Sequence, residues 1–197
     1  MTPRPLITHL DRIIVDRQLA SMWLGRGRRV LELEQRMAAW VGAKYAAAFG
    51  SGTAALTVAL MNEQRRRRVN VPDIDCEALH AAVRAADMVE GIDTELSITL
   101  YPERGAFIED FARHLPRESE TRLIGRFGVF SFGALKDVTG GIGGCLVSHA
   151  PFDVGDWRML SPLSDINAAL ILSQLNRYTG HTRLRAVAEG KIWESPA

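Results

Sequence analysis

The chain has 197 residues, of which 47% are hydrophobic and 24% are charged, and its formal net charge at pH 7 is +1. This balance is typical of one folded globular domain, and it excludes disordered and fibrous proteins. A near-neutral charge gives no reason to expect nucleic-acid binding, because nucleic-acid domains carry a clear basic excess. The one basic run, Arg65 to Arg68, follows a helical segment and is read as a solvated helix end or loop.

The two cysteines, Cys76 and Cys145, have neither metal-ligand spacing nor the density of a secreted disulfide scaffold, so a reducing compartment is predicted. The N-terminal stretch MTPRPLITHLDRII carries charges inside its apolar part, unlike a signal peptide. No run approaches the roughly 18–20 apolar residues that span a bilayer. We expect a cytoplasmic protein with no metal site that binds neither membranes nor nucleic acids.

Helical and strand patterns alternate along the chain. In the first half the predicted elements are a helix over 6–20, a helix over 30–41, a strand over 45–49, a helix over 54–61, a strand over 69–71, a helix over 77–86 and a strand over 88–92. In the second half they are strands over 96–100, 106–108 and 128–132, a helix over 164–177 and a further helix over 181–193. The alternation predicts an α/β fold with a mostly parallel sheet and helices packed on its faces. No linker marks a second domain, so residues 1–197 are predicted to form one.

The turn Gly50-Ser51-Gly52-Thr53-Ala54 lies where a strand gives way to a helix. Backbone N–H groups at a helix start can face an anion, and the two hydroxyl groups add donors, which suits a phosphate. Small residues in such a turn can also serve only to relieve steric crowding. The turn alone therefore leaves both interpretations open.

Two charged residues follow predicted strands. Asp110 stands at a strand end, where open α/β sheets bind ligands, and could pair with a protonated pyridine nitrogen or merely cap a helix. Lys136 lies between the strand over 128–132 and a glycine-rich turn over 140–144. A lysine there can be partly desolvated, which favours the neutral amine that forms imines, although a single lysine is ordinarily a surface residue.

The order of these features, a phosphate-cradling turn, an acid at a strand end and a lysine after a strand, is that of fold-type I pyridoxal-phosphate enzymes. With further matches in the same order, the chain resembles the DegT/DnrJ/EryC1/StrS family of sugar aminotransferases. The matching stretches are 25–27, 41–46, 51–56, 108–110, 128–132 with Lys136 and Gly143-Gly144, 165–170 and 174–175.

The resemblance implies a three-layer sandwich like the large domain of fold-type I transferases, reduced in size, with the C-terminal small domain absent. It implies that Lys136 forms a Schiff base with pyridoxal 5′-phosphate and moves the proton, and that Asp110 holds the pyridinium nitrogen. Gly52, Thr53 and Ser131 would bind the cofactor phosphate. The full cofactor-binding set implied in this way is Ser51, Gly52, Thr53, Cys76, Asp110, Arg113, Ser131 and Lys136.

Three positions depart from the family pattern. Arg113 stands where the family usually has a glutamine that contacts the ring hydroxyl group, and a cation there could still reach that oxygen. Cys76 lies in the segment where a ring-stacking aromatic residue is common, and it offers less stacking area. Ile142 replaces a usual glutamate. The stretch over 93–106 is also shorter than in family members.

The resemblance implies a transaminase that moves an amino group from an amino acid, with glutamate the expected donor, to a keto-sugar nucleotide in polysaccharide or antibiotic-sugar biosynthesis. It also implies a homodimer, with the N-terminal helices and the 164–177 helix as candidate interface surfaces. One alternative is a catalytically impaired homologue that serves as a scaffold or as the partner subunit of a full-length enzyme. Another is a degraded copy without a selected function.

Overall fold

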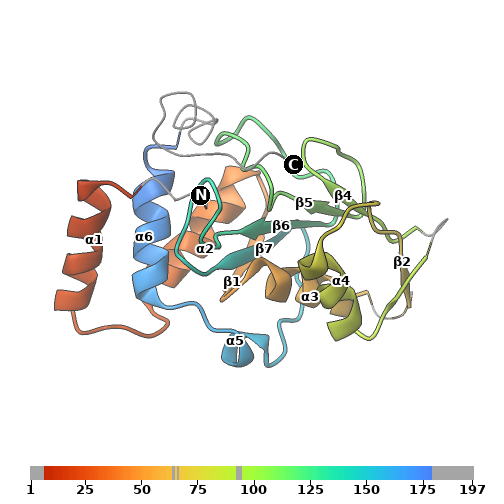
Figure 1. Ribbon diagram of the computed structural model, residues 1–197, viewed down its shortest axis with the longest axis horizontal. Helices are drawn as coiled ribbons and strands as arrows, with labels where there is room; N and C mark the ends of the chain where they lie inside the picture. The colour runs from red at the N-terminus through yellow and green to blue at the C-terminus, as the bar shows by residue number, and fades with distance from the viewer. Residues whose placement is uncertain (1–6, 64, 66, 92–94, 179–197) are drawn as a thin grey trace.

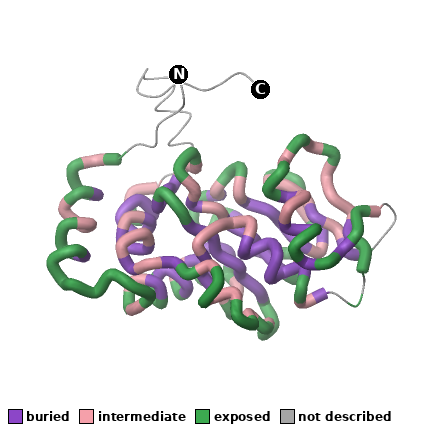
Figure 2. The backbone as a smooth tube through the Cα atoms, turned by 60° about the horizontal axis from the view of Figure 1, so that its bottom comes forward, coloured by how far each residue is buried: buried purple, intermediate pink, exposed green. Residues whose placement is uncertain are grey.

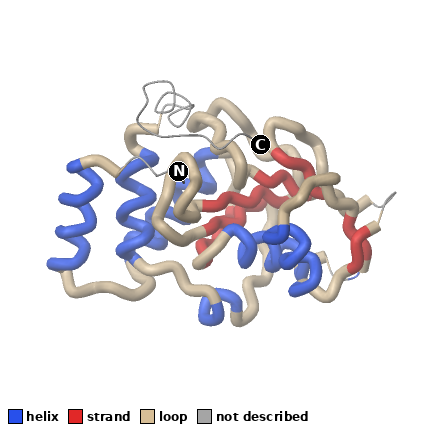
Figure 3. The backbone as a smooth tube through the Cα atoms, in the orientation of Figure 1, coloured by secondary structure: helices blue, strands red, loops and turns tan. Residues whose placement is uncertain are grey.

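A computed structural model describes residues 7–63, 65, 67–91 and 95–178 (Figures 1 and 3). The helices are α1 (His9–Ala20), α2 (Arg28–Trp40), α3 (Gly52–Met61), α4 (Glu77–Ala85), α5 (Trp157–Leu160) and α6 (Asp165–Leu175). The strands are β1 (Tyr45–Phe49), β2 (Arg68–Val69), β3 (Val89–Glu90), β4 (Ile98–Leu100), β5 (Ile108–Asp110), β6 (Phe127–Ser131) and β7 (Gly144–Ser148). The predicted helix over 181–193 lies outside the described residues.

The central sheet has five strands in the order β1-β7-β6-β5-β4. Strand β7 is antiparallel to both of its neighbours, whereas β4, β5 and β6 pair in parallel, so β1, β4, β5 and β6 all point the same way. The predicted α/β fold with a mostly parallel sheet is therefore confirmed. The sequence analysis misses β7, because its five residues are all buried and show no alternation.

Helices cover both faces of this sheet, which gives three layers (Figure 1). Successive strand residues point to opposite faces. In β7, Leu146 joins the core beneath α3 and α4, while Cys145 and Val147 join the core beneath α2 and α6. Figure 2 shows the buried residues gathered in the sheet and the helices that cover it, with α1 largely exposed.

Both edges of the sheet make further hydrogen bonds. Beside β4, the N–H group of Asn70 donates to the carbonyl of Leu96 (2.8 Å), and the carbonyl of Asn70 accepts from the N–H group of Ile98 (2.9 Å). Beside β1, the N–H group of Ala48 donates to Glu34 Oε1 (3.0 Å). Glu34 is a buried residue of α2, so a side chain occupies part of the β1 edge.

Glu34 is itself held by two cations. Its Oε1 lies 3.1 Å from Arg158 Nη2 and 3.5 Å from Arg26 Nη2. Two residues further along the chain, just after β1, the N–H group of Gly50 donates to the carbonyl of Ser161 (2.8 Å). These contacts attach the segment around α5 to the start of the β1–α3 connection.

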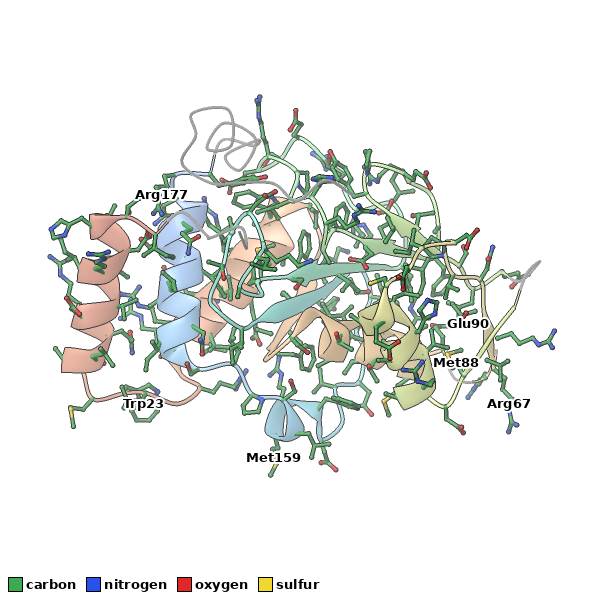
Figure 4. All side chains as sticks on the ribbon, viewed as in Figure 1. Trp23, Arg67, Met88, Glu90, Met159 and Arg177 are labelled. Atoms are coloured by element: carbon green, nitrogen blue, oxygen red, sulfur yellow. The ribbon has the colours of Figure 1, made fainter. Side chains whose placement is uncertain are left out.

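Helix α1 packs on α6 at one end of the molecule, and its attachment is polar (Figure 4). An amphipathic helix is predicted here, but the buried residues of α1 are Asp11 and Gln18. Asp11 accepts hydrogen bonds from Ser173 Oγ (2.7 Å), in the last turn of α6, and from Arg177, two residues after the helix. Burial raises the pKa of Asp11, but Arg177, Thr8 and Ser173 outweigh it and hold that pKa below its ordinary value.

Helix α6 has eight buried residues among its 11, so core packing rather than a free interface is its role within the described chain. The described residues of the basic run, Arg65, Arg67 and Arg68, have exposed side chains, as predicted, and Arg67 projects outward in Figure 4. Among the described helices, none is long and apolar enough to cross a membrane.

Candidate active site

A cleft of about 570 Å³ opens beside the carboxyl ends of β4, β5 and β6 and the turn between β1 and α3. Because these strands are parallel to one another, their ends meet at one edge of the sheet, the usual ligand-binding edge of α/β folds. The volume falls within the range of small-molecule sites. Of the eight residues predicted to bind the cofactor, the structure brings seven to this cleft: Gly52, Thr53, Cys76, Asp110, Arg113, Ser131 and Lys136.

The eighth predicted residue, Ser51, is the N-cap of α3. Its hydroxyl accepts a hydrogen bond from the N–H group of Ala54 (3.0 Å) and does not line the cleft. The next two N–H groups, those of Gly52 and Thr53, lie in the first turn, where helices leave N–H groups without partners inside the helix. Together with the positive end of the helix dipole, these groups favour an anion at this end of the cleft.

Close packing fixes the position of this turn. A Cβ atom on Gly52 would come within 2.8 Å of the Cβ of Ser131, and one on Gly144 within 2.2 Å of the carbonyl oxygen of Ser51. Glycine at both positions therefore lets the α3 start approach β6 and β7. As a result, Ser131 stands directly beside the first turn of α3, and within the described chain neither its hydroxyl nor that of Thr53 makes a side-chain hydrogen bond.

Asp110 is a buried carboxylate facing the cleft from the end of β5. Its Oδ1 accepts a hydrogen bond from the N–H group of Ala112 (2.7 Å), and among the described residues Oδ2 has no hydrogen-bond partner. Burial raises the pKa of Asp110 above its ordinary value, against the lowering effects of the Ala112 N–H group and the charge of Lys136. A cation placed at Oδ2 would favour the ionised form.

The preceding residue, Glu109, is fully buried and has a contrasting environment. Its Oε1 accepts from Arg104 Nε (2.7 Å) and the N–H group of Gly105 (3.2 Å), and its Oε2 accepts from the N–H groups of Ile124 (2.9 Å) and Gly125 (3.3 Å). Burial raises the pKa of Glu109, but these donors outweigh it and lower the pKa overall. Glu109 thus secures the loops around β5 while Asp110 faces the cleft.

Lys136 is half-buried in a loop between β6 and β7. The loop is closed at its base, where the N–H group of Gly140 donates to the carbonyl of Phe132 (2.9 Å). Gln174 of α6 holds the same base in two directions. Its Oε1 accepts from the N–H group of Thr139 (3.1 Å), and its Nε2 donates to the carbonyl of Thr139 (2.6 Å).

A second residue of α6, Asn167, donates from Nδ2 to the carbonyl of Gly140 (2.8 Å). The sequence analysis gives Asn167 and Gln174 no role of their own, although both lie in stretches that match the family. The sequence could have indicated a role for them, because each is a polar residue in an otherwise apolar helical stretch. Such a residue is buried only when it has partners.

The sequence analysis also gives no structural role to Asp165, at the start of α6. Its Oδ1 accepts hydrogen bonds from the N–H groups of Gly27 (2.9 Å) and Val30 (3.0 Å), which caps the start of α2. The helix therefore positions both the lysine loop and a second helix.

Cys76 and Arg113 lie on the walls of the cleft. Cys76 is a free, half-buried cysteine at the N-cap of α4 and contributes no side-chain cap hydrogen bond. Arg113 is exposed and follows β5 by three residues. Within the described residues no cluster of three or more histidine, cysteine, aspartate or glutamate side chains could hold a metal ion.

The sequence profile of the DegT/DnrJ/EryC1/StrS aminotransferase family matches residues 7–88. The chain resembles this family. The resemblance predicted from the sequence is therefore confirmed, and the matched stretch includes Ser51, Gly52, Thr53 and Cys76. Comparison with curated protein sequences finds no match.

Solved structures show the same fold. PseC of Helicobacter pylori, an aminotransferase involved in the biosynthesis of pseudoaminic acid, is 20% identical with a TM-score of 0.75, and the alignment covers 93% of this chain and 66% of PseC. Spr1654 of Streptococcus pneumoniae in its PLP form is 19% identical with a TM-score of 0.69, covering 90% of this chain and 66% of Spr1654. DesI in the presence of its TDP-sugar product is 21% identical with a TM-score of 0.71, covering 88% of this chain and 59% of DesI.

The chain spans about two thirds of the length of the first of these structures. The cleft residues fit the group that Spr1654 carries in its PLP form. The first turn of α3 and two hydroxyl groups suit a phosphate, the free oxygen of Asp110 suits a protonated ring nitrogen, and Lys136 supplies an amine in the same cleft.

Proposed function

We propose that this chain binds pyridoxal 5′-phosphate in the cleft and transfers an amino group from an amino acid to a keto sugar. The observation that supports this proposal is the convergence of Lys136, Asp110 and the first turn of α3 on one cleft. The likeness to the family and the fold shared with PseC, Spr1654 and DesI agree with it.

Each cleft residue has a defined role in the proposal. The N–H groups of Gly52 and Thr53, with the hydroxyls of Thr53 and Ser131, bind the phosphate. Asp110 accepts a hydrogen bond from the ring nitrogen and keeps it protonated. One N–H group of Arg113 would donate to the ring hydroxyl oxygen, and Cys76 would pack against the ring.

When bound, pyridoxal phosphate supplies an aldehyde that reacts with amines and a ring that accepts electrons. Lys136 would hold this group through its amine and, whenever that amine is free, would carry a proton at its nitrogen atom. Gln174 keeps the base of the loop that carries Lys136 fixed at Thr139. Ser51 contributes by capping α3 rather than by touching the ligand.

For the acceptor we infer a keto-sugar nucleotide, which the structure of DesI in the presence of its TDP-sugar product supports. For the donor we infer glutamate from the family resemblance alone. We also infer a single domain over the described residues, a cytoplasmic location and a homodimer. The exposed apolar side chains of α1 and the loop after it support an interface there: Leu10, Leu19, Met22, Trp23 and Leu24. Analytical ultracentrifugation tests the dimer, and a monomer at micromolar concentration would contradict it.

The decisive experiment is titration of the purified protein with pyridoxal phosphate, followed by absorbance and by borohydride reduction. We expect a visible band that saturates with one cofactor per chain, and a reduced covalent linkage that mass spectrometry places on Lys136. The Lys136→Ala variant should lose both signals. The matched control is Lys44→Ala, because Lys44 is an exposed lysine outside the cleft.

A second measurement separates cofactor binding from turnover. Conversion of glutamate to 2-oxoglutarate with loss of the visible band is the expected half-reaction. A protein that binds the cofactor through Lys136 but never performs this half-reaction would instead match the catalytically impaired homologue. A protein without the band would refute the proposed function altogether.

A further inference from the structure

Arg113 is the cleft residue that departs most in charge from the family pattern. It is exposed, and it lines the large cleft together with Asp110 and Lys136. It also lines a small adjoining hollow that Lys136 shares. In contrast, Arg104 and Arg126 lie close to buried carboxylates, at 2.7 Å from Glu109 and 2.5 Å from Glu63.

Within the described residues, the guanidinium group of Arg113 makes no ion pair or hydrogen bond. Its charge is therefore available to a ligand in the cleft. An arginine offers five N–H donors in a planar fork, which matches the two oxygens of a carboxylate. One donor can serve a ring oxygen and still leave a pair free for a second ligand.

The other charged side chains of the cleft lining are Asp75, Asp110 and Lys136. The proposed function, on which this inference rests, gives roles to the last two. Asp110 and Lys136 are engaged by the cofactor, and Asp75 is an acid. Arg113 is thus the cation in the cleft lining that remains for the anionic part of a substrate.

The place of Arg113 in the cleft indicates which anionic group of a substrate it would bind. An amino acid carries its α-carboxylate on the same carbon as the nitrogen that is exchanged, so the carboxylate must lie close to the amine of Lys136. The diphosphate of a sugar nucleotide is several bonds from the reacting carbon. A cation that shares both the cleft and the small hollow with Lys136 suits the nearer group.

We propose that Arg113 binds a carboxylate of the amino donor and so selects an amino acid over a simple amine. The side chain acts as a forked, charged receptor in the lining that it shares with Lys136. It contributes to donor specificity in addition to its contact with the ring oxygen.

The test measures binding of glutarate, a dicarboxylate that cannot transfer an amino group, to the protein loaded with pyridoxal phosphate. Isothermal titration calorimetry gives the dissociation constant. We expect Arg113→Gln to raise it about 10- to 100-fold, because charge-assisted bidentate hydrogen bonds are strong. Arg113→Lys should give a smaller rise, since lysine keeps the charge but not the fork. Arg117→Gln, an exposed arginine outside the cleft lining, should leave binding unchanged.

Two companion titrations, with pyridoxal phosphate and with uridine diphosphate, identify what Arg113 serves. Glutamine keeps an N–H donor for the ring oxygen but loses the charged fork, so affinities for both that stay within about threefold of wild type in Arg113→Gln would support the proposal. A loss confined to uridine diphosphate would assign Arg113 to the nucleotide and overturn it. A loss confined to the cofactor, or wild-type protein that binds no glutarate, would also overturn it. These outcomes differ from absence of a Lys136-dependent band, which refutes the proposed function itself.

Discussion

Replacing Glu109 with glutamine should destabilise the fold strongly, because this fully buried carboxylate holds two loops to β5. Glutamine keeps one acceptor oxygen, which can still serve Arg104 Nε and the N–H group of Gly105. Its NH₂ group would face the N–H groups of Ile124 and Gly125, so donors would meet donors. An unsatisfied buried donor costs about 1–3 kcal/mol, and loss of one member of a buried ion pair about 3–5 kcal/mol.

Arg104 is partly exposed, with 24% of its side chain accessible, so water offsets part of this cost. We expect Glu109→Gln to lower the free energy of unfolding by roughly 2–4 kcal/mol in urea at pH 7, and Tm by roughly 5–15 °C. Glu103→Gln is the matched control, because Glu103 is exposed on the same loop. A loss below about 1 kcal/mol would refute the assigned role of Glu109.

The contribution of Glu109 to stability should depend on pH. The folded protein holds the pKa of Glu109 below its ordinary value of 4.5, so the stabilisation is fully present above pH 4.5 and is lost as pH falls through the folded pKa. The stability difference between wild type and Glu109→Gln should therefore be constant from pH 7 to pH 5 and shrink below pH 4. A difference that persists unchanged to pH 3 would show that the ionised carboxylate is not responsible.

Three other substitutions test the site. Asp110→Asn should raise the Tm of the cofactor-free protein at pH 8, because the folded pKa of Asp110 is raised and its stabilisation is lost as pH rises through that pKa. The same variant should bind pyridoxal phosphate more weakly. Unchanged affinity would argue against a contact between Asp110 and the ring nitrogen. Gln174→Leu leaves both backbone groups of Thr139 without this partner, so unfolding in urea should lose roughly 2–4 kcal/mol, and limited proteolysis should cut the Lys136 loop faster than in wild type. Gly52→Ala places a Cβ atom 2.8 Å from that of Ser131, so calorimetry should show cofactor affinity falling at least about tenfold, whereas wild-type affinity would mean that the turn tolerates a shift.

The fold could be predicted well where periodicity is strong. The strand Tyr45–Phe49 has the predicted bounds, and α2, α4 and α6 lie within two residues of their predicted ends. Strand β7 was missed because a wholly buried strand beside glycines has no alternating pattern. The four-residue helix α5 is too short to show a helical period.

The sequence could group the residues of the candidate site but could not give their arrangement. The family resemblance identified seven residues that the structure brings to one cleft. It could not show that Ser51 caps α3, because capping and phosphate binding require the same residue types at the same turn. Nor could it assign Gln174, whose partner Thr139 is 35 residues away in the sequence.

The occupied edges of the sheet bear on how this chain meets other chains. An edge strand with free N–H and carbonyl groups invites a further strand and, with it, aggregation. Here Glu34 takes an N–H group of β1, Ser161 takes that of Gly50 just after the strand, and Asn70 lies against β4. Association by sheet extension is thus disfavoured at both edges, which leaves assembly to the helical surfaces. Glu34 in particular acts against aggregation, because its side chain takes an edge N–H group that another strand would otherwise bind.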